Sequence, residues 1–239
     1  MNRVLGFAKA QDLERIALFY ADNEFPQEVA SGVRARAAKL GLQIVFDEEY
    51  PRDSTEFAGL VKRIRISNPD IVVGATYFDD SVAFVRQAKA GHLQPQAFAF
   101  TVGPALAEFG EALGDDAEGV MGVVQWIRSE GLPAGYDFSY RYKAAYGRNP
   151  SHVVAFGYGA GQVLEAAVRL AGSLDRDKVR EQLGQMKFRS LLGHYRVDET
   201  GMQVANETQV IQWQDGRRRL IFPKHMAESV FRLPTRRLE

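Results

Sequence analysis

Aromatic, hydroxyl and carboxylate side chains gather where the sequence passes from extended runs into helical ones. Five of them are candidates to contact a small molecule: Tyr20, Phe25, Tyr77, Phe78 and Thr101. Rings offer an apolar surface, and hydroxyls and nearby carboxylates hold polar groups, so this mixture suits a small zwitterion or a polar acid. The simpler alternative is that Asp79 and Asp80 only cap a helix and that Tyr77 packs at a rim.

The first half of the chain alternates between two hydrophobic periods, which predicts strands followed by helices. The expected strands cover residues 15–20, 42–46, 71–73, 97–100 and 120–125, and helices are expected over 26–40, near 57–64 and from Asp79 to Gly91. This alternation predicts a doubly wound parallel sheet over residues 12–126, with helices on both faces. Ligands of such sheets bind beyond the carboxyl ends of the strands, where the five candidates lie.

The second half is predicted to differ, with helices at 136–146, 153–171 and 177–186 and short strands at 194–197, 209–213 and 219–222. The 153–171 helix carries only two charges, Glu165 and Arg169, and a helix that is apolar almost all round is normally buried on several sides. Gly157, Gly159 and Gly161 are costly inside a helix, so they indicate either that a neighbouring backbone approaches closely or that the helix starts later than residue 153. We therefore expect this half to need a further sheet that covers it.

Composition excludes several classes of function. Thirty basic residues balance thirty acidic ones, so neither nucleic acid nor a membrane surface is a favoured partner. The absence of cysteine excludes disulfides and thiolate chemistry. No apolar run reaches the roughly 18 residues of a membrane span, and the apolar stretch at Val4–Ala8 is too short for an export signal. The chain expressed as given would therefore be cytoplasmic.

Enzyme signatures are weak, and we expect no catalytic residue, no metal and no cofactor. The glycines at 157–161 do not follow a strand as a dinucleotide loop requires, and the four histidines are scattered. A small α/β enzyme that uses Asp79 or Asp80 stays an alternative. A buried carboxylate with a shifted pKa at that position would favour it.

Several short motifs, in the right order, resemble the extracytoplasmic Leu/Ile/Val-type solute-binding proteins of ABC transporters. The sequences that carry the resemblance are RIALFYADNEFPQE (15–28), DIVV (70–73), VRQAK (85–89), EGV (118–120), FGY (156–158), VDETG (197–201) and VIQW (210–213). That family has the type I periplasmic-binding-protein fold, in which two α/β lobes close on a ligand. The resemblance implies a binding protein for a small polar solute such as an amino acid or a related organic acid.

The resemblance also implies how the chain is divided. Residues 1–127 correspond to the family's second, ligand-binding lobe, 128–208 to the returning part of the first lobe, and 209–239 to a crossover strand and a C-terminal hairpin on the second lobe. The opening part of the first lobe has no counterpart. The implied fold is therefore α/β, with one doubly wound parallel lobe plus an incomplete lobe.

Further expectations follow from the resemblance. Phe25 and Tyr77 fall where the family places rings against the ligand, and Thr101 falls where amino-acid binders carry a carboxylate for the ammonium group. A transporter permease is the implied partner, and the implied location is periplasmic. A ligand-sensing module of the same fold is the alternative. We also expect weak ligand affinity and self-association through an exposed apolar surface on the 153–171 helix.

Overall fold

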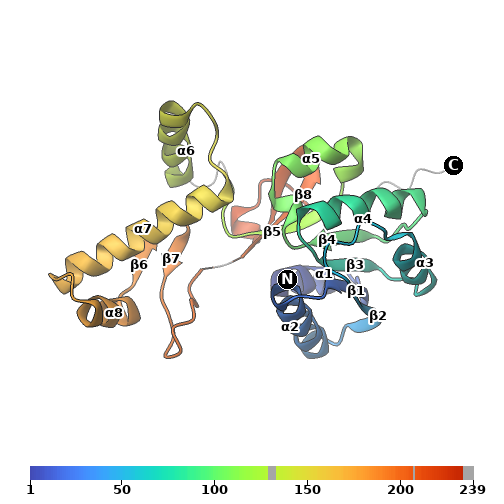
Figure 1. The fold of residues 1–239 in the computed structure, drawn as a ribbon, viewed down its shortest axis with the longest axis horizontal. Helices are drawn as coiled ribbons and strands as arrows, with labels where there is room; N and C mark the ends of the chain where they lie inside the picture. The colour runs from blue at the N-terminus through green and yellow to red at the C-terminus, as the bar shows by residue number, and fades with distance from the viewer. Residues whose placement is uncertain (129–132, 207, 234–239) are drawn as a thin grey trace. The chain divides into compact units, whose positions relative to one another are not determined.

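The structure is a computed structural model that describes residues 1–128, 133–206 and 208–233. The chain forms two compact units (Figure 1). Unit 1 comprises Met1–Val123 and Val210–Glu239, and unit 2 comprises Val124–Gln209. Each unit has its own core, so the two are described separately.

Unit 1 is built on a mostly parallel sheet. Its strands are β1 (Arg15–Ala21), β2 (Gln43–Tyr50), β3 (Ile71–Ala75), β4 (Ala97–Phe100), β5 (Met121–Val124), β8 (Gln209–Gln214) and β9 (Arg217–Phe222). They lie in the order β2-β1-β3-β4-β5-β8-β9. Strands β1 to β5 pair in parallel, and β8 and β9 form an antiparallel hairpin. The predicted α/β class with a parallel sheet is confirmed.

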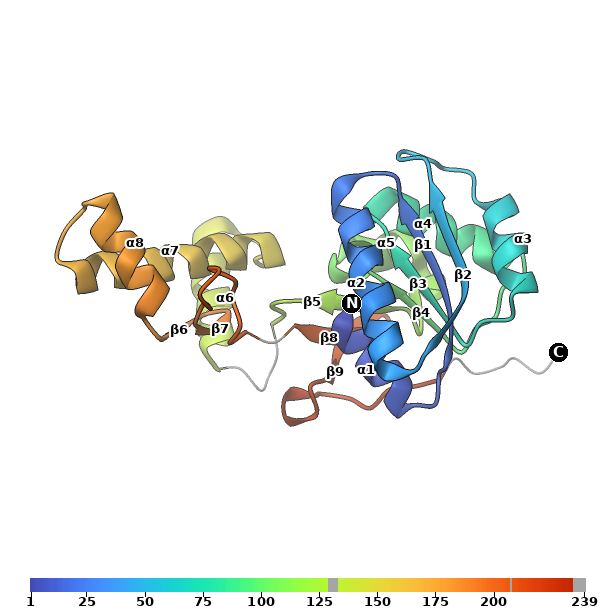
Figure 2. The same cartoon turned by 90° about the horizontal axis from the view of Figure 1, so that it is seen from below.

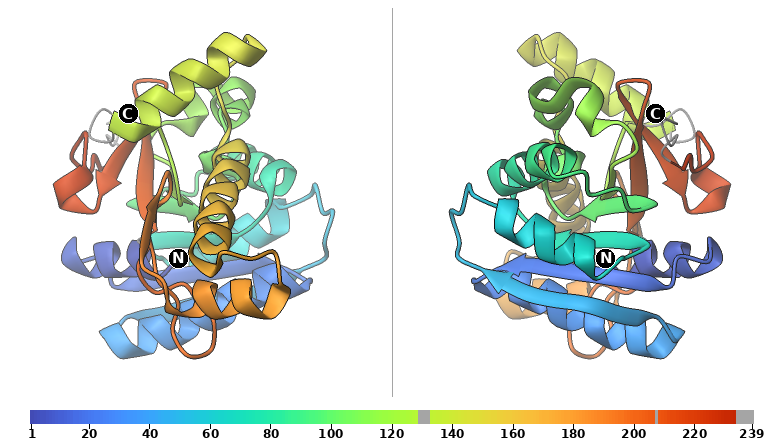
Figure 3. Two further views of the ribbon diagram at one scale, coloured as in Figure 1. Left: turned by 90° about the vertical axis from the view of Figure 1, so that its left-hand side faces the viewer. Right: turned by 90° about the vertical axis from the view of Figure 1, so that its right-hand side faces the viewer.

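Helices cover both faces of this sheet, as the alternating pattern predicts (Figures 2 and 3). On one face lie α1 (Asn2–Ala10) and α2 (Glu24–Leu40), and on the other lie α3 (Ala58–Ile66) and α4 (Phe78–Ala90). A short helix, α5 (Glu108–Leu113), and three 3-10 turns, 103–105, 114–117 and 224–226, complete the unit. Helix α2 ends at Gly41, whose left-handed φ of 67° suits glycine.

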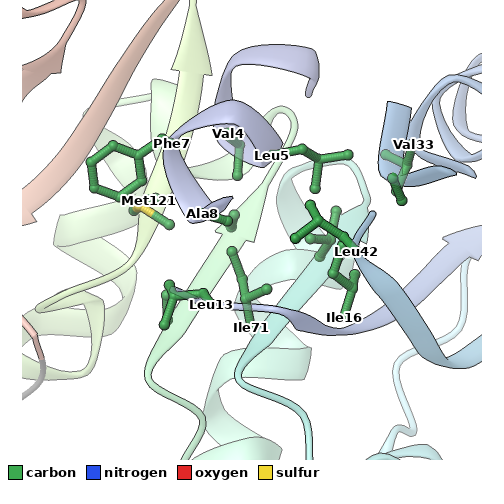
Figure 4. Packing of buried hydrophobic residues seen from close by; sticks show 14 of the residues in the cluster. Val4, Leu5, Phe7, Ala8, Leu13, Ile16, Val33, Leu42, Ile71 and Met121 are labelled. Atoms are coloured by element: carbon green, nitrogen blue, oxygen red, sulfur yellow. The ribbon is translucent and has the colours of Figure 1, made fainter. Parts of the chain in front are cut away.

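The helix α1 is the main element that the sequence reading missed. Val4, Leu5, Phe7 and Ala8 are buried in one cluster with core residues of the sheet (Figure 4). Their spacing marks one face of a helix, but the apolar run is too short to show a period by itself. The segment that we read only as unlike an export signal is therefore a core helix.

The opposite face of the sheet packs aromatic rings. Phe19 stacks on Phe84 with ring centroids 4.1 Å apart, and Phe100 and Phe57 each meet Phe84 edge to face at 5.8 Å. A Cβ at Gly74 would lie 2.5 Å from the Phe100 ring, so glycine is required in the middle of β3. These ring contacts connect β1 and β4 to α4 on this face of the sheet.

Unit 2 contains α6 (Pro133–Tyr146), α7 (His152–Ala171), α8 (Arg176–Gln185) and a hairpin of β6 (Phe188–Ser190) with β7 (Gly193–Tyr195). Ser151 and Asp175 cap α7 and α8 by accepting hydrogen bonds from backbone N–H groups. Strand β6 was not predicted, and β7 replaces the strand expected at 194–197. Two small clusters, one around Phe138 and one around Val179, form the hydrophobic core of this unit.

Helix α7 is packed on one side and open on another. A Cβ at Gly159 would lie 2.7 Å from Leu192, whereas a Cβ at Gly157 or Gly161 would meet nothing within 4 Å. A neighbouring group therefore approaches α7 closely at Gly159 alone of these three glycines, and that group is the side chain of Leu192 rather than the predicted backbone. Val153, Leu164 and Leu170 of α7 are exposed, which confirms the expected exposed apolar surface on this helix. Self-association through that surface stays a prediction.

Candidate ligand-binding site

The candidate site lies at the carboxyl edge of the parallel strands in unit 1. Strands β1 and β3 are neighbours there, with Tyr20 paired to Ala75. The chain passes from β1 into α2 and from β3 into α4. The first turns of both helices therefore lie at this edge of the sheet. Neither helix has a side-chain cap hydrogen bond at its start, and the first N–H groups of a helix have no intrahelical acceptor.

The rings of Phe25 and Tyr77 and the side-chain amide of Asn23 lie close together at the starts of α2 and α4. The ring of Phe25, in the first turn of α2, lies 5.9 Å from that of Tyr77, which precedes α4, with 47° between the ring planes. Phe25 is 43% exposed. The side-chain nitrogen of Asn23 donates to the Tyr77 hydroxyl oxygen at 2.7 Å. Because this oxygen accepts that bond, the hydroxyl proton of Tyr77 is available to an incoming acceptor.

Two buried acceptors at the same edge lack partners among the described residues. They are the side-chain oxygens of Asn23 and Thr76. Leaving a buried polar atom unpaired costs about 1–3 kcal/mol. Such atoms at the end of parallel strands are typical of a site that a polar ligand completes.

Asp80 is the buried carboxylate of this edge, and it is already paired. The Tyr50 hydroxyl donates to it, and the backbone N–H of Ser81 donates to its Oδ1 atom at 2.9 Å. Burial and the hydrogen bond to Asp80 raise the pKa of Tyr50 far above its ordinary value, so the hydroxyl stays protonated. Asp79 is exposed. Neither Asp79 nor Asp80 is the N-cap of α4, so the alternative that these two aspartates only cap the helix is wrong. Helix α4 begins at Phe78, one residue earlier than predicted.

Thr101 is engaged by the backbone of the neighbouring strand end. Its Oγ1 atom accepts from the N–H of Thr76 at 2.9 Å and donates to the carbonyl oxygen of Thr76. The hydroxyl therefore joins the ends of β3 and β4, and its proton is in use. A direct role of Thr101 in ligand binding stays a prediction.

Tyr20 and Phe78 are not part of the ring pair. The Tyr20 hydroxyl accepts a hydrogen bond from Arg34 of α2 at 2.9 Å, and that guanidinium lies 5.0 Å from the ring centroid. The hydrogen bond to Asp47 raises the pKa of Arg34. Phe78 is half-buried at the first position of α4. Of the five candidates, the structure brings Phe25 and Tyr77 together. Tyr20 packs against the core cluster that includes Val33 of α2, and Thr101 bonds to Thr76 at the end of β3.

Sequence reasoning missed Asn23 and Tyr50 as parts of this edge. Asn23 lies between β1 and α2, and its side-chain amide reaches Tyr77 at the end of β3. Tyr50 was missed because β2 was expected to end at residue 46. Strand β2 is the edge of the sheet, so the acidic residues Asp47 to Glu49 continue it with their side chains partly in solvent.

Among the described residues, no group of three histidine, aspartate or glutamate side chains is placed to hold a metal ion. None of the helices described there is long and apolar enough to cross a bilayer.

The family model described as periplasmic binding protein matches residues 1–218. The chain belongs to the periplasmic binding protein family. This match confirms the resemblance carried by the short motifs and agrees with the mostly parallel sheet of unit 1.

Curated relatives in this family are longer than the chain. The Leu/Ile/Val-binding protein homolog 7 of Brucella suis is 26% identical over 231 residues, which are 92% of this chain and 58% of the relative. Homolog 8 of Brucella abortus is 24% identical over 246 residues, covering 95% of this chain and 59% of the relative. The chain thus spans under two thirds of the length of these family members.

Solved structures show the same fold. A leucine-binding protein from Thermotoga maritima superposes with a TM-score of 0.82 at 22% identity, covering 92% of this chain and 63% of that one. A solute-binding protein of an ABC transporter from Rhodopseudomonas palustris, solved in complex with benzoate, gives a TM-score of 0.77 at 18% identity, covering 92% and 61%. At these identities the likeness supports the fold of the family and leaves the ligand open.

Proposed function

We propose that this chain is the solute-binding component, or part of it, of an ABC transporter, and that unit 1 holds one side of a small polar solute. The observation that carries the proposal is the exposed Phe25 ring beside Tyr77, whose hydroxyl proton is available. The unpaired oxygen of Asn23 lies at the same edge. Ring, donor and acceptor together fit a molecule with an apolar body and a polar end.

The ligand class that fits is an amino acid or a related organic acid. The names of family members mention leucine, Leu/Ile/Val and benzoate, which share a carboxylate and an apolar body. The uncapped starts of α2 and α4 offer N–H groups to a carboxylate. Asp80 is paired with Tyr50, which leaves the buried part of this edge without an unpaired carboxylate for an ammonium group.

Unit 1 corresponds, in this proposal, to the second lobe of the family (residues 1–127 with 209–239), and residues 128–208 correspond to the returning part of the first. The chain spans 58–66% of the relatives and neighbours it matches. Closing two lobes buries the solute from both sides, so one lobe alone binds with low affinity. A permease partner, a periplasmic location and the absence of catalysis belong to the same proposal.

The experiment that tests this function is a titration of the Phe25→Ala variant with L-leucine and with benzoate, observed by NMR. Losing one side of the ring pair weakens binding by about 0.5–1.5 kcal/mol, or roughly 2- to 13-fold. Ile66→Ala removes an exposed apolar side chain from α3 and is the matched control, with no change expected. Equal affinities in wild type and the Phe25 variant would contradict the proposed site.

A further inference from the structure

The two segments that carry the ring pair are rich in acidic residues and contain no basic ones. Residues 22–28 follow β1 and residues 76–80 follow β3. Together they hold five carboxylates and no lysine or arginine: Asp22, Glu24, Glu28, Asp79 and Asp80. The whole chain has equal numbers of acidic and basic residues, so this imbalance is local. It gives the carboxyl edge of β1 and β3 a negative potential, which attracts cations.

Two of these carboxylates lie beside the rings and have no counter-charge. Glu24 directly precedes Phe25, and Asp79 lies two residues after Tyr77. Both side chains are exposed, and neither has an ion-pair or hydrogen-bond partner in the part of the chain that the structure describes. An acid in the first turn of a helix also offsets the positive end of the helix dipole. The carboxylates by themselves therefore do not identify a ligand.

The rings and the unpaired oxygens of the same edge indicate the charge of the ligand. An ammonium group within about 6 Å of the face of an aromatic ring is attracted to that ring, and the Phe25 ring is exposed. The buried side-chain oxygens of Asn23 and Thr76 lack hydrogen-bond partners, and Thr76 is fully buried. The nitrogen of the Asn23 amide donates to Tyr77, so its oxygen is the acceptor left at the ring pair. Rings, unpaired acceptors and carboxylates without a basic side chain suit a positively charged group.

We propose, on the basis of the function proposed above, that the solute of this edge is a basic amino acid such as L-lysine. The uncapped starts of α2 and α4 offer N–H groups to its α-carboxylate. The apolar part of its side chain lies against Phe25, and its side-chain ammonium group faces Glu24 and Asp79. A neutral amino acid lacks this last contact, and benzoate carries only the charge that the acidic segments repel.

The test compares L-lysine with L-norleucine, which has the same carbon chain and no side-chain ammonium group. Both are titrated into the wild-type chain by amide NMR at an ionic strength of about 10 mM, where exposed charges are screened least. We expect lysine to bind at least about fivefold more tightly, because it adds a ring contact and two exposed ion pairs. Added salt of about 0.5 M should bring this affinity ratio close to one.

A pair of substitutions separates ligand binding from helix stability. Glu24→Gln combined with Asp79→Asn is expected to lower the ratio of lysine to norleucine affinity by about twofold or more. A loss of helix stability alone would weaken the binding of both amino acids alike and leave the ratio unchanged. The matched control is Asp177→Asn, which removes the same charge from the first turn of α8 in unit 2 and should not change the ratio.

The possible failures of this proposal and of the proposed function differ. Norleucine that binds as tightly as lysine would overturn the basic amino acid and leave the solute site in place. A ratio that the Glu24 and Asp79 substitutions do not change, or that Asp177→Asn lowers equally, would do the same. If lysine, norleucine, leucine and benzoate all leave the amides of residues 22–25 and 76–80 unshifted, the proposed function fails and the ligand assignment fails with it.

Discussion

The residues at the carboxyl edge of the sheet in unit 1 fall into two groups with different roles. Tyr50, Asp80 and Thr101 join the ends of neighbouring elements through hydrogen bonds that leave them few free atoms. Asn23, Phe25 and Tyr77 form a group with an exposed ring and unused hydrogen-bonding capacity. The first set makes the edge rigid, and the second set is what a solute can contact.

Tyr50→Phe tests the rigid set. The variant leaves Asp80 buried without its strongest partner, so we expect the free energy of unfolding to fall by about 1–3 kcal/mol. Urea denaturation near pH 8 measures this loss, and Tyr140→Phe, at an exposed tyrosine of α6, is the control with no expected change. An unchanged midpoint in Tyr50→Phe would show that the pair does not contribute to stability.

The contribution of Tyr50 also depends on pH. The pKa of Tyr50 is raised in the folded state above its unfolded value of about 10, so the stabilisation is fully present below about pH 10. It declines as pH rises further, because the unfolded tyrosine ionises first. The stability difference between wild type and Tyr50→Phe should therefore be smaller near pH 11 than near pH 8. A difference that grows with pH would contradict this assignment.

At the scale of elements, α7 has one side packed against its neighbours and another side open. Gly159 lies under Leu192, while Gly157 and Gly161 face open space. Gly159→Ala therefore forces Leu192 aside, and overpacking of this kind typically costs about 1–3 kcal/mol. Gly157→Ala has no such clash and gains up to about 1 kcal/mol of helix propensity.

Thermal unfolding of the Gly157→Ala and Gly159→Ala variants checks this difference. We expect the melting temperature of Gly157→Ala to lie above that of Gly159→Ala, with Gly161→Ala behaving like Gly157→Ala. If all three alanines shift the melting temperature alike, α7 does not have the packed side and the open side that the structure shows.

At the scale of the whole molecule, the sequence alone predicts the fold class and the edge of the sheet where the candidate site lies. Buried runs such as Ile71–Ala75 alternate with amphipathic helices, and this alternation requires a parallel sheet whatever the details of packing. The position of Tyr77 directly after such a strand then places it at the carboxyl edge. These conclusions need only local patterns.

Other features depend on contacts between residues far apart in the sequence and were not predictable. Helix α1 is stabilised by Leu13, Ile71 and Met121, which its own short sequence does not indicate. The pairing of Tyr50 with Asp80 joins residues 30 positions apart, across a strand end that was placed too early. The open side of α7 likewise follows from what the rest of the chain leaves uncovered.

The most direct test of the central claim is an amide NMR titration of the isotope-labelled chain with L-leucine and with benzoate. The structure predicts that the shifted amides cluster at residues 22–25 and 76–80, at the carboxyl edge of the sheet in unit 1. Shifts that map to the opposite edge of the sheet, or none at ligand concentrations on the order of 10 mM, would contradict the claim that this edge binds the solute.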